Sequence, residues 1–331
     1  MTDLAGARWR VSWADAGDEQ RGRGMSRKPV IVATLSLLAA TLFWAGNYVV
    51  GAAAVESLDP LSLVFLRWAF AAIPLLVLAH LIERPRWRDV LRAWPWLIAL
   101  SATGVVAYTL LLYTALQFTD AFNASLINAF NPALISVAAV LFLRERLSAT
   151  AVIGIVLALV GVLIVLSRGS FDGFFDGGFG IGDVFMVGAI VAWTAYTILG
   201  RRGPRIPPIT STAVQVVIAV VVLAPITLLA GGPAIPPTPS VWGALAFIVV
   251  FPSVLSYLLW NRALGVIPPA RAGVFLNLIT VFTAALTLLL GQPFTVSQVV
   301  GGVIVLGGVA LANLQAFRPA KESGTTAATS R

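Results

Sequence analysis

Residues 149–166 read ATAVIGIVLALVGVLIVL and contain no charged side chain. A helix crosses the hydrocarbon core of a bilayer with about 20 apolar residues, at about 1.5 Å per residue. The apolar residues follow one another here without the alternation that marks a strand of a membrane β-barrel. This stretch therefore predicts a transmembrane helix.

The whole chain has the same apolar character. Of its 331 residues, 59% are hydrophobic and 11% are charged, whereas soluble domains carry about 25% charged residues. Too few polar residues are present to cover a globule of this size. The expected surroundings are a lipid bilayer, in which the backbone satisfies its own hydrogen bonds within helices.

Similar apolar runs extend in both directions from this stretch. They predict ten transmembrane helices, at 30–55, 61–82, 94–118, 121–143 and 149–166, and at 183–200, 209–230, 241–264, 271–290 and 296–316. Residues 1–29 lack the apolar core of a signal peptide and are expected to form a disordered cytosolic tail. Residues 167–182 form a Gly-rich outer linker, and 317–331 form a second cytosolic tail.

Basic residues fall almost entirely between alternate pairs of these helices. With the N-terminus inside, the inner segments hold Arg84, Arg86, Arg88, Arg92, Arg144, Arg146, Arg201, Arg202, Arg205, Arg262, Arg271, Arg318, Lys321 and Arg331. The outer loops hold only Arg168. This bias predicts that both termini are cytoplasmic, and the scarcity of lysine suggests a bacterial cytoplasmic membrane. The net charge of +8 is then a property of membrane orientation and not of nucleic-acid binding.

The chain also matches itself after a shift of about 147–149 residues. Trp44 meets Trp193, Gly154 meets Gly301, and Gly161 meets Gly308. A repeat of five helices has an odd number of spans, so its copy must be inserted with the opposite orientation. We therefore predict an all-α integral membrane protein of ten transmembrane helices in two inverted five-helix repeats, residues 30–166 and 183–316. Inverted repeats recur in secondary transporters, although a duplicated membrane protein of another role would share the pattern.

Several short motifs, in order, resemble those of EamA-type transporters of the drug/metabolite transporter superfamily. The first helix carries LFWAGNYVV at 42–50, and the second carries Pro60 and later Leu66-Arg67. Asn131-Pro132 and LRERL at 143–147 follow in helices 4 and 5. The resemblance covers about residues 30–316 and implies transport through a central cavity lined by helices 1, 3, 4, 6, 8 and 9.

Among the aligned positions at which the two halves differ, three are candidates for a functional asymmetry. Arg67 is matched by Gln215, Pro132 by Thr280 and Glu145 by Gln292. Members of the family often have proline where Thr280 stands. Pro132 is expected to bend helix 4, because proline removes a backbone hydrogen bond, and Glu145 is a candidate for capping or gating.

The composition argues against an enzyme. The chain has no cysteine and a single histidine, His80, so it offers no thiolate nucleophile and no cluster of typical metal ligands. No Gly-rich phosphate loop is present. We therefore expect no catalytic residue, no metal site and no cofactor.

Arg67 is the one ionisable residue placed well inside a predicted span. Charged groups in the hydrocarbon are costly and mark functional sites, so Arg67 is a candidate to attract a substrate carboxylate. The alternative is a structural arginine that pairs with Glu56 or Asp59 or extends its side chain toward the interface. A mid-span acid that would carry a proton is missing, which disfavours proton-driven export of cationic drugs.

Neutral polar and aromatic residues are plentiful within the spans, where they are candidates to line a cavity. The candidate substrate-binding residues are Trp44, Asn47, Arg67, Tyr108, Tyr113, Asn128, Asn131, Trp193, Tyr196, Tyr257, Trp260, Asn261 and Asn277. Hydrogen bonds between helices are the alternative explanation for each of them. Glycines in helices 5 and 10 are expected to form scaffold contacts or the face of a homodimer.

The sequence therefore predicts an exporter of small metabolites, with amino acids or related compounds as the preferred class. An importer, or a carrier of drugs, sugars or nucleotides, is the first alternative. A structural or regulatory membrane protein and an intramembrane enzyme are further alternatives, disfavoured by the polar interior and by the missing catalytic groups. The expected partners are a small-molecule substrate and the lipid bilayer.

Overall fold

The computed structural model describes residues 27–144, 147–167, 180–267, 272–273 and 275–312. All regular elements in these ranges are helices. The first half contains α2 (Arg27–Val55), α3 (Pro60–Leu78), η1 (Ala79–Glu83), α4 (Trp87–Arg92), α5 (Trp94–Leu100), η2 (Ser101–Ala107), α6 (Tyr108–Leu116), α7 (Ala121–Ala129), α8 (Asn131–Leu143) and α9 (Ala149–Leu166). The second half contains α11 (Ile181–Arg202), α12 (Pro208–Leu229), α13 (Pro239–Ile248), η3 (Val249–Leu255), α14 (Ser256–Leu264), α16 (Leu278–Leu289) and α17 (Val296–Ala312).

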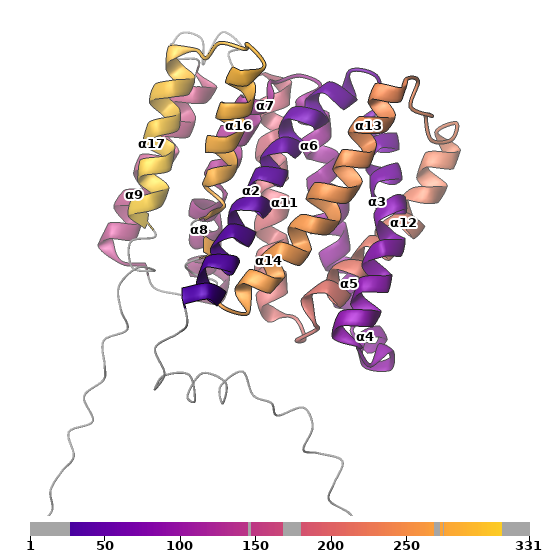
Figure 1. Ribbon diagram of the computed structural model, residues 1–331. Coiled ribbons are helices and arrows are strands. Elements are labelled where there is room, and N and C mark those ends of the chain that lie inside the picture. The colour runs from indigo at the N-terminus through magenta and orange to yellow at the C-terminus, as the bar shows by residue number, and fades with distance from the viewer. Residues whose placement is uncertain (1–26, 145–146, 168–179, 268–271, 274, 313–331) are drawn as a thin grey trace, which may run out of the picture.

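The helices stand side by side in one bundle (Figure 1). We call the end at which α2 begins and α4 lies the lower end, and the opposite end the upper end. Basic residues of the described loops, such as Arg84, Arg144 and Arg205, follow helices that finish or begin at the lower end. The acidic caps Asp59 and Asp120 precede helices that begin at the upper end.

Eight helical segments are long and apolar enough to cross a membrane, and each coincides within a few residues with a predicted span. The ninth and tenth predicted spans, 271–290 and 296–316, are represented by the shorter apolar helices α16 and α17. The described residues therefore do not confirm the count of ten. The predicted tails and linker, apart from a few residues at their edges, lie outside the described residues, as does Glu145.

Two details of the predicted helices need correction. The first helix begins at Arg27, three residues before the predicted start. The predicted span 121–143 is interrupted at Phe130, which separates α7 from α8. Pro132 lies at the start of α8, where the missing backbone N–H of proline costs least. The predicted bend in helix 4 is therefore present as a break between two helices.

Large apolar side chains cover the outside of the bundle. On α9, Val152, Val156 and Leu159 are each more than two-fifths exposed, and on α17 Val303 is 67% exposed. A soluble protein rarely exposes a continuous apolar surface of this kind. The chain is therefore an integral membrane protein with several spans.

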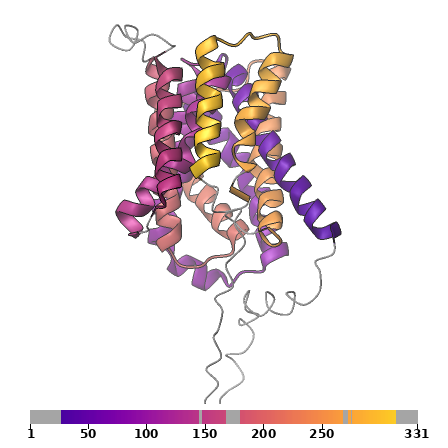
Figure 2. The same ribbon diagram turned by 90° about the vertical axis from the view of Figure 1, so that its left-hand side faces the viewer.

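The helices α9 and α17 pack against each other at one side of the bundle (Figure 2). Gly154, Gly161, Gly301 and Gly308 lie where the two backbones meet, and an added Cβ at any of them would come within 2.7 Å of the facing backbone. Small residues permit this close approach in membranes. These four glycines therefore have the predicted scaffold role within one chain.

One carboxylate connects the two halves at the lower end. Glu83, at the end of η1, accepts hydrogen bonds from the backbone amides of Ile209 at 2.9 Å and Thr210 at 2.7 Å, and from the Thr210 hydroxyl at 2.6 Å. These amides belong to the first turn of α12, which has no intrahelical acceptor for them. Glu83 therefore caps a helix of the other half and fixes α3 against α12.

Two π-helical segments occupy equivalent places in the two halves. The segment η2 spans Ser101–Ala107 and η3 spans Val249–Leu255, a shift of 148 residues, within the 147–149 found for the sequence repeat. Single π turns inside longer helices are rare and occur often at functional sites. Their paired occurrence supports a structural duplication as well as a sequence duplication.

Candidate functional site

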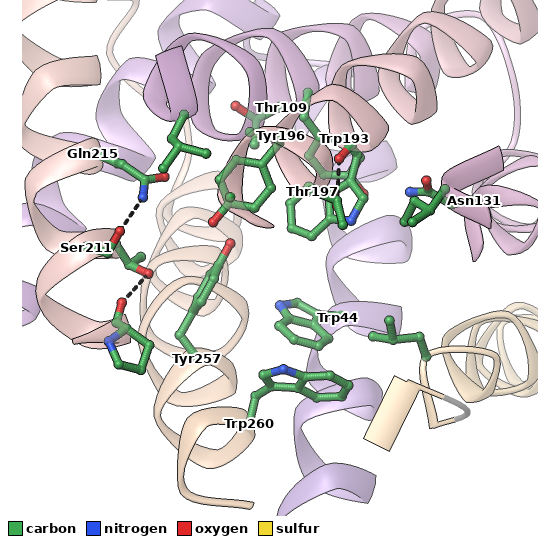
Figure 3. Close-up of a pocket in the computed structure, with 18 of the residues that line it drawn as sticks. Trp44, Thr109, Asn131, Trp193, Tyr196, Thr197, Ser211, Gln215, Tyr257 and Trp260 are labelled. Carbon is green, nitrogen blue, oxygen red and sulfur yellow. Dashed lines mark hydrogen bonds between the residues drawn. The ribbon is translucent and has the colours of Figure 1, made fainter. Parts of the chain in front are cut away.

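A cavity of about 700 Å³ lies inside the bundle and is lined by both halves. Its walls come from α2, α3, the α5–η2–α6 helix, α7 and α8 of the first half, and from α11, α12, α14 and α16 of the second. Figure 3 draws 18 of the lining residues around this space and labels ten of them. The helices α9 and α17 supply none of the lining residues and form the scaffold beside the cavity.

The cavity extends toward the lower end. Residues Gly203–Ile206, between α11 and α12, line it together with Trp96 at the start of α5. The lining residues nearest to the upper end, such as Tyr48, lie within helices, and no described loop of the upper end contributes. The cavity therefore faces one side of the membrane.

An aromatic cluster of Trp44, Tyr257 and Trp260 forms one wall (Figure 3). The ring centroid of Trp44 lies 5.9 Å from that of Tyr257 and 5.4 Å from that of Trp260. The indole nitrogen of Trp44 donates a hydrogen bond of 3.1 Å to the carbonyl of Pro252. Since Pro252 lies in η3, this bond ties the first helix to the π segment of the second half.

A second aromatic cluster contains Tyr108, Trp193 and Tyr196. The ring of Trp193 lies 4.9 Å from that of Tyr108 and 5.0 Å from that of Tyr196. The hydroxyls of Tyr48 and Tyr108 are 3.4 Å apart. In Figure 3 the hydroxyl ends of Tyr196 and Tyr257 point toward each other, so the two clusters meet across the cavity.

Arg67 lines the cavity and is 4% exposed. Its Nε donates to the hydroxyl of Ser253 at 2.7 Å, and its Nη1 donates to the hydroxyl of Tyr113 at 2.7 Å and to Oδ1 of Asn47 at 3.3 Å. The Tyr113 hydroxyl donates in turn to Asn47 at 2.7 Å. The guanidinium carbon lies 4.5 Å from the centre of the Trp68 ring, a cation–π distance.

The alternative pairing of Arg67 with Glu56 or Asp59 is not what the structure contains. The three hydrogen-bond partners of Arg67 are neutral side chains. Asp59 instead caps α3 by accepting a 2.9 Å hydrogen bond from the amide of Ser62. Arg67 is therefore a cation in the membrane interior without a carboxylate partner among the described residues.

Three asparagines stand at the breaks in the helices. Oδ1 of Asn131 accepts a 3.2 Å hydrogen bond from Thr194. Oδ1 of Asn128 and of Asn277 is buried and has no hydrogen-bond partner, and these two residues are 149 positions apart, as repeat partners are. Buried oxygens without a partner are rare and costly, so this pair is suited to donors of a ligand.

Twelve of the thirteen candidate substrate-binding residues line this single cavity: Trp44, Asn47, Arg67, Tyr108, Asn128, Asn131, Trp193, Tyr196, Tyr257, Trp260, Asn261 and Asn277. Tyr113 lies behind Arg67 and positions it. Pro132 also lines the cavity. Binding of a substrate by these residues stays a prediction.

Sequence reasoning did not select several other lining residues. They are Tyr48, Trp68, Trp96, Thr109, Thr197, Ser211, Thr212 and Gln215. Tyr48 lies within the LFWAGNYVV motif, and Gln215 was noted only as the repeat partner of Arg67. Their position on the same helix faces as the selected residues is the sequence signal that could have identified them.

The described residues contain no cluster of three or more His, Cys, Asp or Glu side chains that could hold a metal ion. His80 is exposed near the lower end of the second span. Thr280, the repeat partner of Pro132, donates a 2.9 Å hydrogen bond from its hydroxyl to the carbonyl of Ser125. It thereby joins α16 to α7.

Comparison with known proteins gives consistent results. The profile of the EamA-like transporter family matches twice, at residues 31–167 and 180–314. The uncharacterized transporter YyaM of Bacillus subtilis is 30% identical over 282 residues, which are 84% of this chain and 92% of that protein. An uncharacterized transporter of Archaeoglobus fulgidus is 29% identical over 83% of this chain and 95% of its own length.

More distant matches agree. The uncharacterized inner membrane transporter YhbE of Escherichia coli is 25% identical over 50% of this chain and 53% of its own length. A protein of known crystal structure matches with a TM-score of 0.59 and 21% identity over 86% of this chain and 99% of that one, which shows a shared fold. Both halves of the chain match the same family profile, and proteins named as transporters align with most of its length. The chain therefore belongs to the EamA-like transporter family of the drug/metabolite transporter superfamily and is a membrane transporter.

Proposed function

We propose that the protein exports small metabolites, with amino acids or related compounds as the preferred class, by alternating access. The observation that carries this proposal is the cavity of about 700 Å³, which is enclosed by both halves and lined by polar and aromatic side chains. A space of this size is in the range of small-molecule sites. The neutral amides of Asn128, Asn131 and Asn277 suit a zwitterion.

The alternating-access part of the proposal rests on the duplication. Two matches to one family profile and the paired π segments support ten helices in two inverted five-helix repeats. In such an arrangement the halves can exchange conformations around a fixed midplane site. The cavity would then open to the other side of the membrane when the two halves exchange their conformations.

The orientation follows from the arginines of the lower end. We infer that this end is cytoplasmic, because positively charged loops stay inside, and that both termini are cytoplasmic in a bacterial cell membrane. The conformation described here is then open to the cytoplasm. An importer of the same fold would have the same geometry, so direction is an outcome of the flux experiment below.

The test is a flux screen in proteoliposomes over the proteinogenic amino acids, with and without a pH gradient. A matched pair of glycine variants controls for folding. Gly200 lines the cavity, whereas Gly243 has nothing within 4 Å of an added Cβ and does not line it. Gly200→Leu is expected to reduce flux strongly, and Gly243→Leu is expected to leave it unchanged. No flux of any amino acid would remove the preferred substrate class.

The absence of cysteine makes a second test direct. Asn131→Cys and Asn277→Cys introduce single thiols into the cavity, and membrane-impermeant maleimides are added from either side. Both thiols are expected to react from the cytoplasmic side, and from the outer side during turnover. Thiols that stay unreactive from both sides would contradict the cavity.

A homodimer remains a separate proposal. Four glycines of α9 and α17, Gly154, Gly161, Gly301 and Gly308, are already used in contacts within the chain. A dimer through these helices would therefore use their outer apolar faces, and cross-linking between single cysteines placed at Val156 and Val303 would test it.

A further inference from the structure

We propose that Nη2 of Arg67 is an anion subsite within the cavity. It would bind the carboxylate of the transported solute, so that the protein selects organic carboxylates and zwitterions with an apolar body and rejects cations. The inference rests on the proposed transport function and specifies the class of solute. The sequence suggests only that Arg67 attracts a carboxylate. The structure adds the atom that would bind it, Nη2, and a preference for anionic and zwitterionic solutes over cations.

The described lining of the cavity contains positive side chains and no negative one. Its charged residues are Arg67, Arg201 and Arg205, and none of the described lining residues is an Asp or a Glu. Arg201 and Arg205 lie near the lower opening, and Arg67 lies deep inside. In a medium of low dielectric constant, positive groups repel a cation and attract an anion more strongly than they do in water.

The guanidinium of Arg67 is held along one edge. Its Nε and Nη1 donate hydrogen bonds to Ser253, Tyr113 and Asn47, and no hydrogen bond joins Nη2 to a described residue. Because Arg67 lines the cavity, Nη2 is the nitrogen left to donate to a ligand there. A guanidinium fixed along one edge presents its remaining N–H groups without further loss of side-chain entropy.

Arg67 has no acidic partner among the described residues. A buried cation without a counterion is costly in a membrane, and none of the three partners of Arg67 is an acid. The equivalent position of the second half is occupied by the neutral Gln215, whose Nε2 donates a 2.8 Å hydrogen bond to the hydroxyl of Ser211. A neutral residue is therefore compatible with this part of the fold, and the charge of Arg67 has a use that packing does not supply.

The rest of the cavity indicates the body of the solute. The walls formed by Trp44, Tyr257 and Trp260, and by Tyr108 and Trp193, offer faces of aromatic rings. Ring faces bind flat apolar groups well. They also attract cations, so the charge preference must be tested with probes that share one ring and differ only in charge.

The experiment measures binding to the purified wild-type protein by quenching of tryptophan fluorescence. The four probes are phenylalanine, 3-phenylpropanoate, phenylalaninamide and phenethylamine. We expect the two carboxylates to bind and the two cations without a carboxylate to bind at least tenfold more weakly, since a hydrogen bond to a charged group contributes about 10- to 100-fold in affinity. Equal binding of amine and carboxylate, or no binding of any probe, would overturn the subsite.

Variants separate binding from structure. Arg67→Gln, which copies the second half, should remove the preference for carboxylates, and Arg67→Lys should restore part of it. Gly243 does not line the cavity and has nothing within 4 Å of an added Cβ, so Gly243→Leu should keep the preference. A folded Arg67→Gln variant that still prefers carboxylates would refute the proposal.

The same four probes in a flux assay keep the two proposals apart. Transport of phenethylamine without transport of phenylalanine would leave the protein a transporter and overturn the subsite. Flux of other amino acids without binding of the phenyl carboxylates would likewise retain the proposed function and reject this solute class. Absence of flux for every solute tested would count against the proposed function itself.

Discussion

Two neighbouring glycines of α17 should respond in opposite ways to the same substitution. An added Cβ at Gly308 would lie 2.4 Å from the backbone nitrogen of Ala158 and 2.7 Å from the carbonyl oxygen of Gly154, both on α9. An added Cβ at Gly307 would have nothing within 4 Å. Gly308→Ala and Gly307→Ala therefore change the same helix by one methyl group, one toward α9 and the other toward open space.

The magnitude follows from two terms. Alanine is favoured over glycine inside a helix by about 1 kcal/mol, and this gain applies to both variants. At Gly308 the new carbon is about 1 Å closer to the facing backbone than an ordinary contact allows, so α9 and α17 must separate. Overpacking of this kind costs about 1–3 kcal/mol. Gly307→Ala should stabilise by up to about 1 kcal/mol, and Gly308→Ala should be less stable than Gly307→Ala by about 1–3 kcal/mol.

The assay is reversible unfolding in mixed micelles of increasing SDS content, followed by tryptophan fluorescence. The difference between the two variants isolates the steric term, because the helix-propensity gain cancels. Equal free energies of unfolding for the two variants would refute the packing of α9 on α17. Loss of a dimer in Gly308→Ala, with unchanged stability of the monomer, would show that the glycines serve an interface between chains instead.

Three further substitutions test hydrogen bonds around the cavity. Glu83→Ala leaves two amides of the first turn of α12 without an acceptor and should lower the free energy of unfolding by about 1–3 kcal/mol; micelle unfolding checks this, and an unchanged midpoint would contradict the cap. Tyr113→Phe removes an acceptor of Arg67 and should cost about 1.5–3 kcal/mol, with little effect when Arg67 is already glutamine; a double-mutant cycle without coupling would disprove the link. Asn277→Leu removes a buried oxygen that has no partner and should leave thermal stability equal or higher while flux falls; a marked loss of stability would show that the amide is structural.

The membrane class and most span positions could be predicted because they depend on local composition. Runs such as 149–166 have one energetically acceptable environment, and the observed helix Ala149–Leu166 coincides with the prediction. Two helix starts carry a local signal that the sequence analysis did not use, because Asp59 and Ser148 cap the helices that follow them. The bounds of the last two predicted spans, 271–290 and 296–316, include positions outside the described residues, which place α16 at Leu278–Leu289 and α17 at Val296–Ala312.

The candidate site was predicted as a set of residue types and not as a geometry. Asparagines and aromatic residues inside apolar runs are conspicuous in the sequence. Eleven of these candidates, together with Arg67, line one cavity. The partners of Arg67 could not be read from the sequence, because Ser253 comes from the other half, 186 positions away. Tyr113 was chosen by type, yet its burial behind Arg67 depends on how α6 is rotated, which composition does not encode.

That rotation has a source in the π segment η2. Trp96, Leu100, Gly104, Tyr108 and Leu112 all line the cavity at intervals of four residues. In an uninterrupted α-helix each step of four residues overshoots a full turn by about 40°, so the stripe would drift by about 160° and Leu112 would lie nearly opposite Trp96. The wider turn of a π segment rotates less per residue and reverses this drift midway. One long helix can therefore keep a single line of side chains facing the cavity over most of its length.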